Sequence, residues 1–123
     1  MIPKFRAYDG GSLNRMYQPD EVMVGDGNIW IIDEDSVAGE WIVNNDLNLM
    51  QSTGLLDKNG KEIFEGDIVL VLDSPYTVFY DDERGSYRLK PHDDRWNVDY
   101  MSNFSHGGNF EVIGNIYENK EQL

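Results

Sequence analysis

The sequence predicts a mainly β fold, built as a bent sheet or small barrel with extra strands and room for one short helix. Short apolar or alternating runs recur along the chain, and Gly, Asn, Asp and Pro separate them, as is typical of strands and turns. The length of 123 residues suits one domain spanning residues 1–123. A hydrophobic fraction of 40%, with three Trp, seven Tyr and five Phe, is enough to fill a core.

Three strands are expected before residue 44. Residues 4–9 (KFRAYD) place Phe5 and Ala7 on one face and Arg6 and Tyr8 on the other, which predicts a half-buried strand. Residues 28–32 (NIWII) are mainly apolar and follow a Gly-Asp-Gly turn, which predicts a strand buried on both faces. Residues 40–43 (EWIV) predict a third strand, and the acidic residues 33–35 predict the loop before it.

The clearest local signal lies in residues 49–72 (LMQSTGLLDKNGKEIFEGDIVLVL). The segment Asp57-Lys58-Asn59-Gly60 predicts a tight reversal, because Asp accepts hydrogen bonds from its own backbone downstream and Asn and Gly tolerate positive φ. Gly66-Asp67 predicts a second turn. Residues 68–72 (IVLVL) are apolar without interruption and rich in β-branched side chains, which predicts the central core strand.

The C-terminal part predicts a hairpin and a last strand. Residues 76–80 (YTVFY) and 86–90 (SYRLK) flank an acidic loop closed by Gly85, and Pro75 and Pro91 mark the ends of this hairpin. Residues 93–104 fit both a helical stripe and strand alternation, and we favour a short helix. Residues 110–117 (FEVIGNIY) predict a strand with a bulge at Gly114, and residues 118–123 are expected to fray.

The formal charge of −13 disfavours direct binding to nucleic acid, which draws its free energy from Lys and Arg side chains. The acidity is spread along the chain, because residues 1–62 hold eleven acidic and five basic side chains and residues 63–123 hold twelve and five. Dispersed charge of this kind most simply supports solubility.

The absence of cysteine excludes disulfides, thiolate nucleophiles and cysteine metal ligands, and it suits a cytoplasmic protein. The first residues, MIPKFRAYDGG, lack the apolar stretch of a signal peptide. No segment approaches the ~20 apolar residues that cross a bilayer, so we expect no contact with a membrane.

Three segments carry a resemblance to a known family. KFRAYD (4–9), LMQSTGLLDKNGKEIFEGDIV (49–69) and EVIGNIYEN (111–119), in this order, resemble the YopX-like family, whose members occur mainly in bacteriophages and prophages. The resemblance implies a β-rich domain in the cytoplasm of a bacterial host, with no established activity and no catalytic residues to carry over. Residues 8–48 and 73–110 fit the family loosely, so we expect a member-specific partner to bind there. The turn and strand around residues 66–69 look like those of small SH3-like barrels, which is an analogy of fold alone.

The turn at Asp57 invites comparison with calcium-binding loops, which alternate oxygen ligands and turn at a glycine. The register is wrong for such a loop. With Gly60 at the glycine position, Asn59 and Asp57 take the fifth and third ligand positions, but Leu55 takes the first. A plain turn is the better interpretation.

His92 and His106 are the two histidines, and they lie near Asp93 and Asp94 in the sequence. A metal site or a proton-transfer pair would need these groups to converge. Their spacing is not that of a helical zinc pair, and both histidines occupy loop-like sequence. We therefore expect solvated surface positions.

Other polar motifs also lack a catalytic pattern. The carboxylate pairs Asp81-Asp82 and Asp93-Asp94 are adjacent in sequence, so they face opposite ways on a strand and are solvated in a loop. Gly25-Asp26-Gly27 precedes a strand instead of opening a helix, so it does not predict a phosphate-binding loop.

Trp30, Trp41 and Trp96 raise the question of an interface, since aromatic side chains anchor partner surfaces. Core packing is favoured for most of the aromatic residues. The alternative is at least one exposed aromatic patch rimmed by acidic residues.

The sequence therefore predicts no catalytic residue, no cofactor and no metal ligand. We expect a non-enzymatic module that binds a protein partner or assembles with itself as a homo-oligomer. The second hypothesis is an acidic decoy that imitates the charge of DNA. The third is a metal-dependent hydrolase using Asp93, Asp94 and His106.

Overall fold

The computed structural model describes residues 4–11, 13–33, 35, 37–93, 99–100 and 110–119. These residues are mainly β, as predicted, and their helical part is a single 3-10 turn. The chain divides into two compact units, Met1–Gln51 and Ser52–Leu123, and each contains its own buried hydrophobic cluster. The expectation of a single domain and the comparison with an SH3-like barrel stay predictions.

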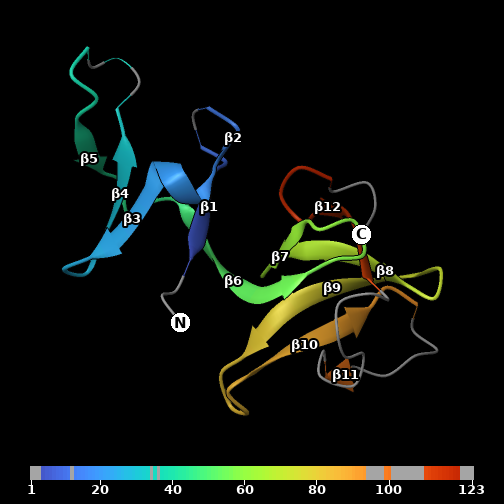
Figure 1. Cartoon of the computed structure of the whole chain (residues 1–123). Coiled ribbons are helices and arrows are strands. Elements are labelled where there is room, and N and C mark those ends of the chain that lie inside the picture. Colours follow the sequence, from blue (N-terminus) through green and yellow to red (C-terminus); the bar gives the residue numbers. More distant parts are fainter. Residues whose placement is uncertain are drawn as a thin grey trace. The chain divides into compact units, whose positions relative to one another are not determined.

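The first unit contains short antiparallel strands (Figure 1). In chain order these elements are β1 (Phe5–Asp9), β2 (Arg15–Tyr17), η1 (Pro19–Glu21), β3 (Val22–Gly25), β4 (Asn28–Ile32), β5 (Trp41–Val43) and the first residues of β6 (Asn48–Leu56). Strand β1 pairs with β2 on one side and with β6 on the other, while β3, β4 and β5 form a separate sheet in that order. The strand predicted at residues 40–43 is confirmed as β5.

Strand β1 is more deeply buried than the alternating pattern predicts. Residues Arg6, Ala7, Tyr8 and Asp9 are all less than a tenth exposed, so the prediction of a half-buried strand is wrong. Besides its sheet neighbours, β1 contacts β3 and η1, and Ala7 packs in one cluster with Val22 of β3.

Strand β4 is less buried than the sequence predicts. It is predicted to be buried on both faces, but Ile31 is the one fully buried residue of its five. Ile31 packs in a cluster with Ala7, Tyr17, Val22 and Leu47. The prediction is wrong because this cluster covers one face of β4 and leaves the other face open.

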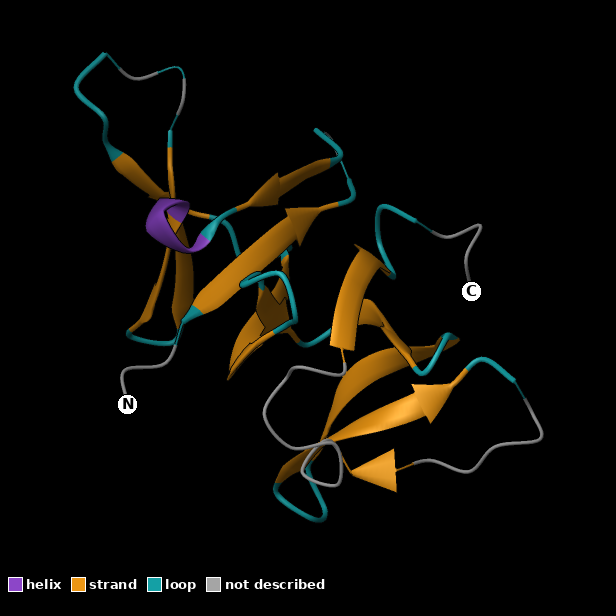
Figure 2. Cartoon of the chain, turned by 45° about the vertical axis from the view of Figure 1, so that its right-hand side comes forward, coloured by secondary structure: helices purple, strands orange, loops and turns teal. Residues whose placement is uncertain are grey.

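The second unit contains a curled antiparallel sheet with the strand order β11-β10-β9-β8-β12, and the remaining residues of β6 pair with β7 (Figure 2). Its further strands are β7 (Glu62–Phe64), β8 (Asp67–Val71), β9 (Ser74–Asp81), β10 (Ser86–Pro91), β11 (Asp99–Tyr100) and β12 (Phe110–Asn115). The core is apolar and closely packed. It consists of Ile63, Val69, Val71, Tyr76, Val78, Leu89 and Phe110.

The central core strand predicted at residues 68–72 is confirmed as β8, which lies between β9 and β12. Leu72 is the exception, because it lies outside the strand and is 83% exposed. Leu72 and Asp73 form the two-residue turn to β9, with φ of +51° and +67°. A tight hairpin of this kind requires positive φ at both positions.

The predicted hairpin at residues 76–90 is confirmed as β9 and β10, with Val78 opposite Leu89. Its strands extend further than predicted. Pro75 lies inside β9 opposite Leu70, and Pro91 is the last residue of β10. The turn before β8 is also confirmed, with Gly66 at φ +87°.

The C-terminal strand has the predicted irregularity, because the pairing of β12 with β8 shifts register between Val112 and Gly114. Fraying of residues 118–123 stays a prediction, although the two of them that the structure describes form hydrogen bonds. The Asn119 Oδ1 atom accepts a hydrogen bond from Asn115 N–H at 3.1 Å, and Glu118 Oε1 accepts one from Asn115 Nδ2 at 2.8 Å. Residues 120–123 lie outside the described residues.

The prediction of a helix over residues 93–104 is wrong for residues 99 and 100. Asp99–Tyr100 form strand β11, which pairs with β10 opposite Arg88 and Leu89. Cross-strand pairing therefore decides between the two periodicities at these residues. Residues 94–98 and 101–104 lie outside the described residues.

Candidate functional site

The sheet of β3, β4 and β5 is apolar on both faces. Its cross-strand pairs place Val22, Ile31 and Ile42 in one row. Val22 and Ile31 of this row face the core of the unit and are 7% and 3% exposed, whereas Ile42 on the edge strand is 42% exposed. Side chains opposite each other share a face, and neighbours along a strand point to opposite faces.

The adjacent row consists of Met23, Trp30 and Val43 and lies on the other side of the sheet. This side is open to solvent, with Met23 49% and Val43 43% exposed. Ile32 and Trp41 form the next cross-strand pair on the same side. We call Met23, Trp30, Ile32, Trp41 and Val43 the outer face.

A shallow groove of about 360 Å³ lies at one end of the outer face. It is lined by Met23, Val24, Gly25, Asp26, Trp30 and Trp41. The Trp30 indole Nε1–H donates to the Gly25 carbonyl at 3.4 Å, which holds the ring against the β3–β4 hairpin. Asp26 and Gly27 have φ of +53° and +77° and form the hairpin turn, so Gly25-Asp26-Gly27 is a strand connection, as its sequence context indicates.

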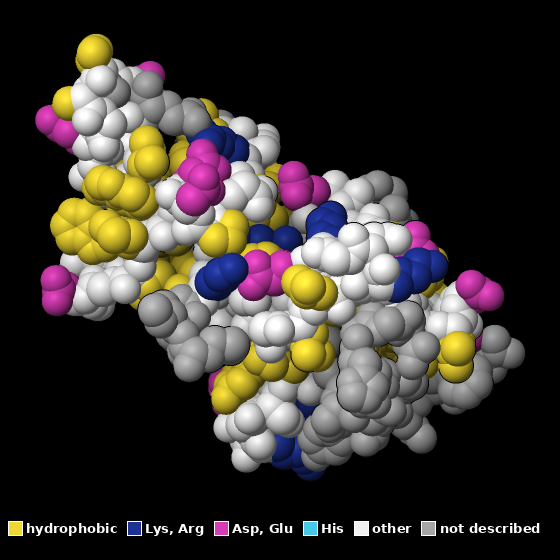
Figure 3. All heavy atoms as spheres, viewed as in Figure 1, with side chains coloured by type: hydrophobic (Ala, Val, Ile, Leu, Met, Phe, Trp, Pro, Cys, Tyr) yellow, Lys and Arg dark blue, Asp and Glu magenta, His cyan; other side chains and the backbone are white. Residues whose placement is uncertain are grey.

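The outer face lies within an acidic part of the chain. Between Arg15 and Lys58 there are nine Asp and Glu residues and no Lys or Arg. Asp26 lines the groove, and Glu40 directly precedes β5. Figure 3 shows apolar side chains gathered over β3–β5 with carboxylates at the margins. The surface therefore combines apolar side chains with neighbouring negative charge.

The aromatic residues divide between the two roles considered for them. Tyr17, Phe64 and Phe110 are buried, as the expectation of core packing requires. Trp30 and Trp41 are half-buried and line the open groove beside Asp26, so the alternative of an exposed aromatic patch with an acidic rim stays a prediction. Trp96 lies outside the described residues.

Sequence reasoning identifies Trp30 and Trp41 as interface candidates but misses Met23, Ile32 and Val43. Their segments, VMVG, NIWII and WIV, contain neighbouring apolar residues, so each strand has apolar side chains on both of its faces. The long stretch without Lys or Arg around them is the sequence signal that could have identified the surface.

The reversal at Asp57 is a hydrogen-bonded turn, as predicted. Asp57 Oδ1 accepts from the N–H groups of Asn59 at 2.9 Å and Lys61 at 2.8 Å, and Oδ2 accepts from Val112 N–H at 3.0 Å. Burial raises the pKa of Asp57, but the N–H groups of Val112, Lys61 and Asn59 and the Lys61 charge together outweigh it, so the pKa lies below 3.8. Leu55, at the first position of the rejected calcium pattern, packs against the buried cluster. Asp57 therefore joins the β6–β7 hairpin to β12.

The histidine and aspartate candidates are described only in part. His92 Nε2 lies 2.8 Å from Thr77 Oγ1, and Asp93 follows it in a bend. Asp94 and His106 lie outside the described residues. Among the residues that are described, no three His, Asp or Glu side chains gather closely enough to hold a metal ion.

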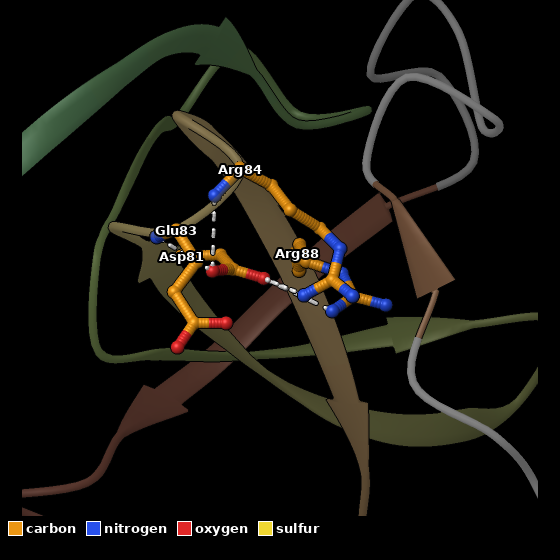
Figure 4. A network of polar contacts seen from close by, with 4 residues as sticks. All are labelled: Asp81, Glu83, Arg84 and Arg88. Atoms are coloured by element: carbon orange, nitrogen blue, oxygen red, sulfur yellow. Dashed lines mark hydrogen bonds and ion pairs between the residues drawn. The ribbon is translucent and has the colours of Figure 1, made fainter.

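Asp81 and Asp82 do not act as a pair, because Asp81 is engaged in its own hairpin (Figure 4). Asp81 Oδ2 accepts from Arg84 Nη1 at 3.2 Å and Arg88 Nη1 at 3.0 Å, and Oδ1 accepts from the N–H groups of Glu83 and Arg84. Desolvation raises the pKa of Asp81, but the Arg88 and Arg84 side chains and the two N–H groups lower it by more, to below 3.8. The network closes the β9–β10 turn.

These features define a small antiparallel β protein that presents an apolar sheet face within an acidic stretch. The family model described as YopX protein matches residues 4–123, so the chain belongs to the YopX family, as its three motifs indicate. The chain is similar to a solved structure described as protein EF1440 from Enterococcus faecalis, with 32% sequence identity and a TM-score of 0.64. That match covers 100% of this chain and 99% of the other.

No curated protein matches the sequence. The described residues include no helix with the length and apolarity needed to cross a bilayer. The phage or prophage origin and the cytoplasmic location stay predictions.

Proposed function

We propose that this chain is a non-enzymatic protein-binding module and that the outer face of β3–β5 is its binding surface. The observation that carries the proposal is the exposure of apolar side chains on the outer face. Met23 and Val43 are more than two fifths exposed there, whereas on the other side Val22 and Ile31 are buried and only the edge residue Ile42 of their row is comparably exposed. Covering such side chains with a partner contributes about 25 cal/mol of transfer free energy per Å² of apolar surface, which offsets the entropy lost on association.

The two tryptophans support binding to a protein. Tryptophan is enriched among the residues that dominate binding energy, because its large rigid ring buries much surface at modest cost in conformational entropy. The hydrogen bond from Trp30 to Gly25 already restricts one of these rings. Trp30 and Trp41 both line the groove, where a protruding side chain of a partner fits.

Charge favours a different protein over a second copy of this chain at the outer face. Two copies meeting through this face would bring together two stretches with nine acidic and no basic residues each, and like charges oppose such a contact. Self-assembly through another surface stays a prediction, which light scattering of the purified chain tests. The apolar centre of the face also disfavours the decoy hypothesis, since a DNA mimic presents charge there.

The test compares two substitutions that add the same charge at exposed apolar residues. Val43→Glu changes the outer face, and Leu56→Glu changes β6 in the second unit, where Leu56 is 55% exposed. We expect wild-type protein and Leu56→Glu to recover the same partner from lysates of the native host in quantitative mass spectrometry. Val43→Glu should weaken that complex by about 2 kcal/mol, or roughly thirtyfold.

The affinity of each variant for the recovered partner is then measured with purified proteins, after thermal unfolding has confirmed that both variants fold. Equal affinity for Val43→Glu and Leu56→Glu would place the binding surface elsewhere. If wild-type protein recovers no partner, the proposed function is wrong.

A further inference from the structure

Strand β5 is an edge of its sheet. The strand order ends at β5, with no further strand beside it among the described residues. Two hydrogen bonds fix the direction of its backbone groups: Asn44 N–H donates to the Ile29 carbonyl at 2.9 Å, and Asp33 N–H donates to the Glu40 carbonyl at 2.8 Å. Residues 40 and 44 therefore turn their backbone groups toward β4.

The direction of backbone groups alternates along an antiparallel strand. Ile42, opposite Ile31, consequently also turns its N–H and C=O toward β4. Trp41 and Val43 turn theirs away from β4, to the open side of β5. An edge of this kind is a template for another extended segment.

The same two residues contribute side chains to the outer face. A segment that pairs with the backbone of Trp41 and Val43 therefore places every second side chain on the outer face, next to their side chains. Pairing extends the three-stranded sheet and covers part of its open apolar side. The backbone edge and the apolar face thus select one kind of ligand, an extended segment with apolar residues at alternate positions.

Charge decides what the remaining positions of that segment carry. Glu40 precedes β5, Asp26 lies at the groove, and Lys and Arg are missing from residues 16–57. We infer that β5 accepts a basic, extended segment of a partner protein as an added strand, with alternating apolar and Lys or Arg side chains. This inference rests on the proposed protein-binding function and names the mode of binding and the chemistry of the partner.

The first experiment selects ligands without assuming their sequence. A display library of random peptides of about ten residues, enough for one strand, is selected on the immobilised full-length chain at low salt. We expect the enriched peptides to alternate apolar and polar residues, to carry an excess of Lys and Arg, and to lose affinity at high salt. N-methylation of alternate amides on the pairing edge of one enriched peptide should weaken its binding about tenfold.

The second experiment changes the backbone of β5. Val43→Pro removes an N–H that points away from β4, which an edge strand tolerates, whereas Val43→Ala shortens the side chain and keeps the N–H. The enriched peptide should bind Val43→Pro about tenfold more weakly than Val43→Ala. Ile42→Pro removes an N–H that faces β4, so it should lower the melting temperature while Val43→Pro does not.

Several results would overturn the inference: no enriched peptide, enriched peptides without an excess of Lys and Arg, or equal binding to Val43→Pro and Val43→Ala. A peptide that binds equally well with and without N-methyl groups would exclude strand addition, whether or not Val43→Pro folds. None of these outcomes tests the proposed function itself, which the comparison of Val43→Glu with Leu56→Glu tests. If Val43→Glu loses the protein partner and the peptide selection fails, the outer face binds a folded surface of the partner instead of an extended segment.

Discussion

Replacing Asp57 tests how the β6–β7 hairpin is held to β12. In Asp57→Asn one side-chain oxygen remains, but an amide N–H₂ replaces the other. If the oxygen stays with Asn59 and Lys61, the amide N–H₂ faces the N–H of Val112, and if the side chain flips, it faces the turn. In either orientation a donor meets a donor.

The expected cost follows from this geometry. Losing one hydrogen bond to a carboxylate and leaving a donor poorly satisfied lowers the free energy of unfolding by about 2 kcal/mol. Asp57→Ala removes all three bonds and should cost about 3 kcal/mol, since two of the donors lie in a turn that water can reach. Such losses are large against the roughly 5–15 kcal/mol that stabilises a domain.

Urea unfolding of the full chain measures both variants, and Asp57→Asn should move the midpoint down by about 1 M. Asp82→Asn is the matched control, because Asp82 is an exposed acidic residue in the turn between β9 and β10. Its midpoint should change by less than the equivalent of about 0.5 kcal/mol. Equal midpoints for wild type and both Asp57 variants would refute the assigned role.

The pH dependence gives the same test a second readout. Folding lowers the pKa of Asp57 below its ordinary 3.8, so its contribution is complete above 3.8 and is lost as the pH falls through the lower folded value. The difference in the free energy of unfolding between wild type and Asp57→Asn should therefore be constant near neutral pH and decrease progressively as the pH falls below 3.8. A difference that does not shrink in acid would contradict this explanation.

Two further predictions concern the second unit. In Gly114→Ala the added Cβ would lie 2.5 Å from Asn119 Oδ1, so the substitution should destabilise the chain but add little to Asn119→Ala. Urea midpoints of the single and double variants measure this, and additive losses would contradict it. Asp81→Ala should accelerate amide hydrogen exchange at Glu83 and Arg84, because their N–H groups donate hydrogen bonds to Asp81 Oδ1. Hydrogen exchange with mass spectrometry tests this against Asp82→Ala, and equal exchange in the two variants would refute it.

The parts of the fold that sequence predicts are those whose cause is local. The reversal at Asp57 follows from an Asp that binds its own downstream backbone and a Gly60 at φ +82°. The β9–β10 hairpin follows from two runs close together in the chain. Leu72 has no such local signal, because leucine rarely adopts positive φ and the closure of β8 on β9 imposes it.

Burial is harder to predict than strand position, because it depends on elements far along the chain. The alternation in β1 indicates one polar face, yet Arg6 and Tyr8 on that face are buried along with Ala7. The candidate site has the same difficulty. Trp30 is recognisable as an anchor, but the row of Met23, Trp30 and Val43 exists only in the register of three strands.

Strands β4 and β8 show what an uninterrupted apolar run means physically. Both runs predict burial on two faces, and in β8 the neighbours Ile68 and Val69, which point to opposite faces, are fully buried. In β4 the same pattern leaves Trp30 in an open groove while Ile31 is buried. The run therefore reports how much apolar surface a strand must cover, and not whether its own chain supplies the cover. Both faces of β8 are covered, and for β4 the uncovered side is the outer face, where we propose that a partner completes the sheet.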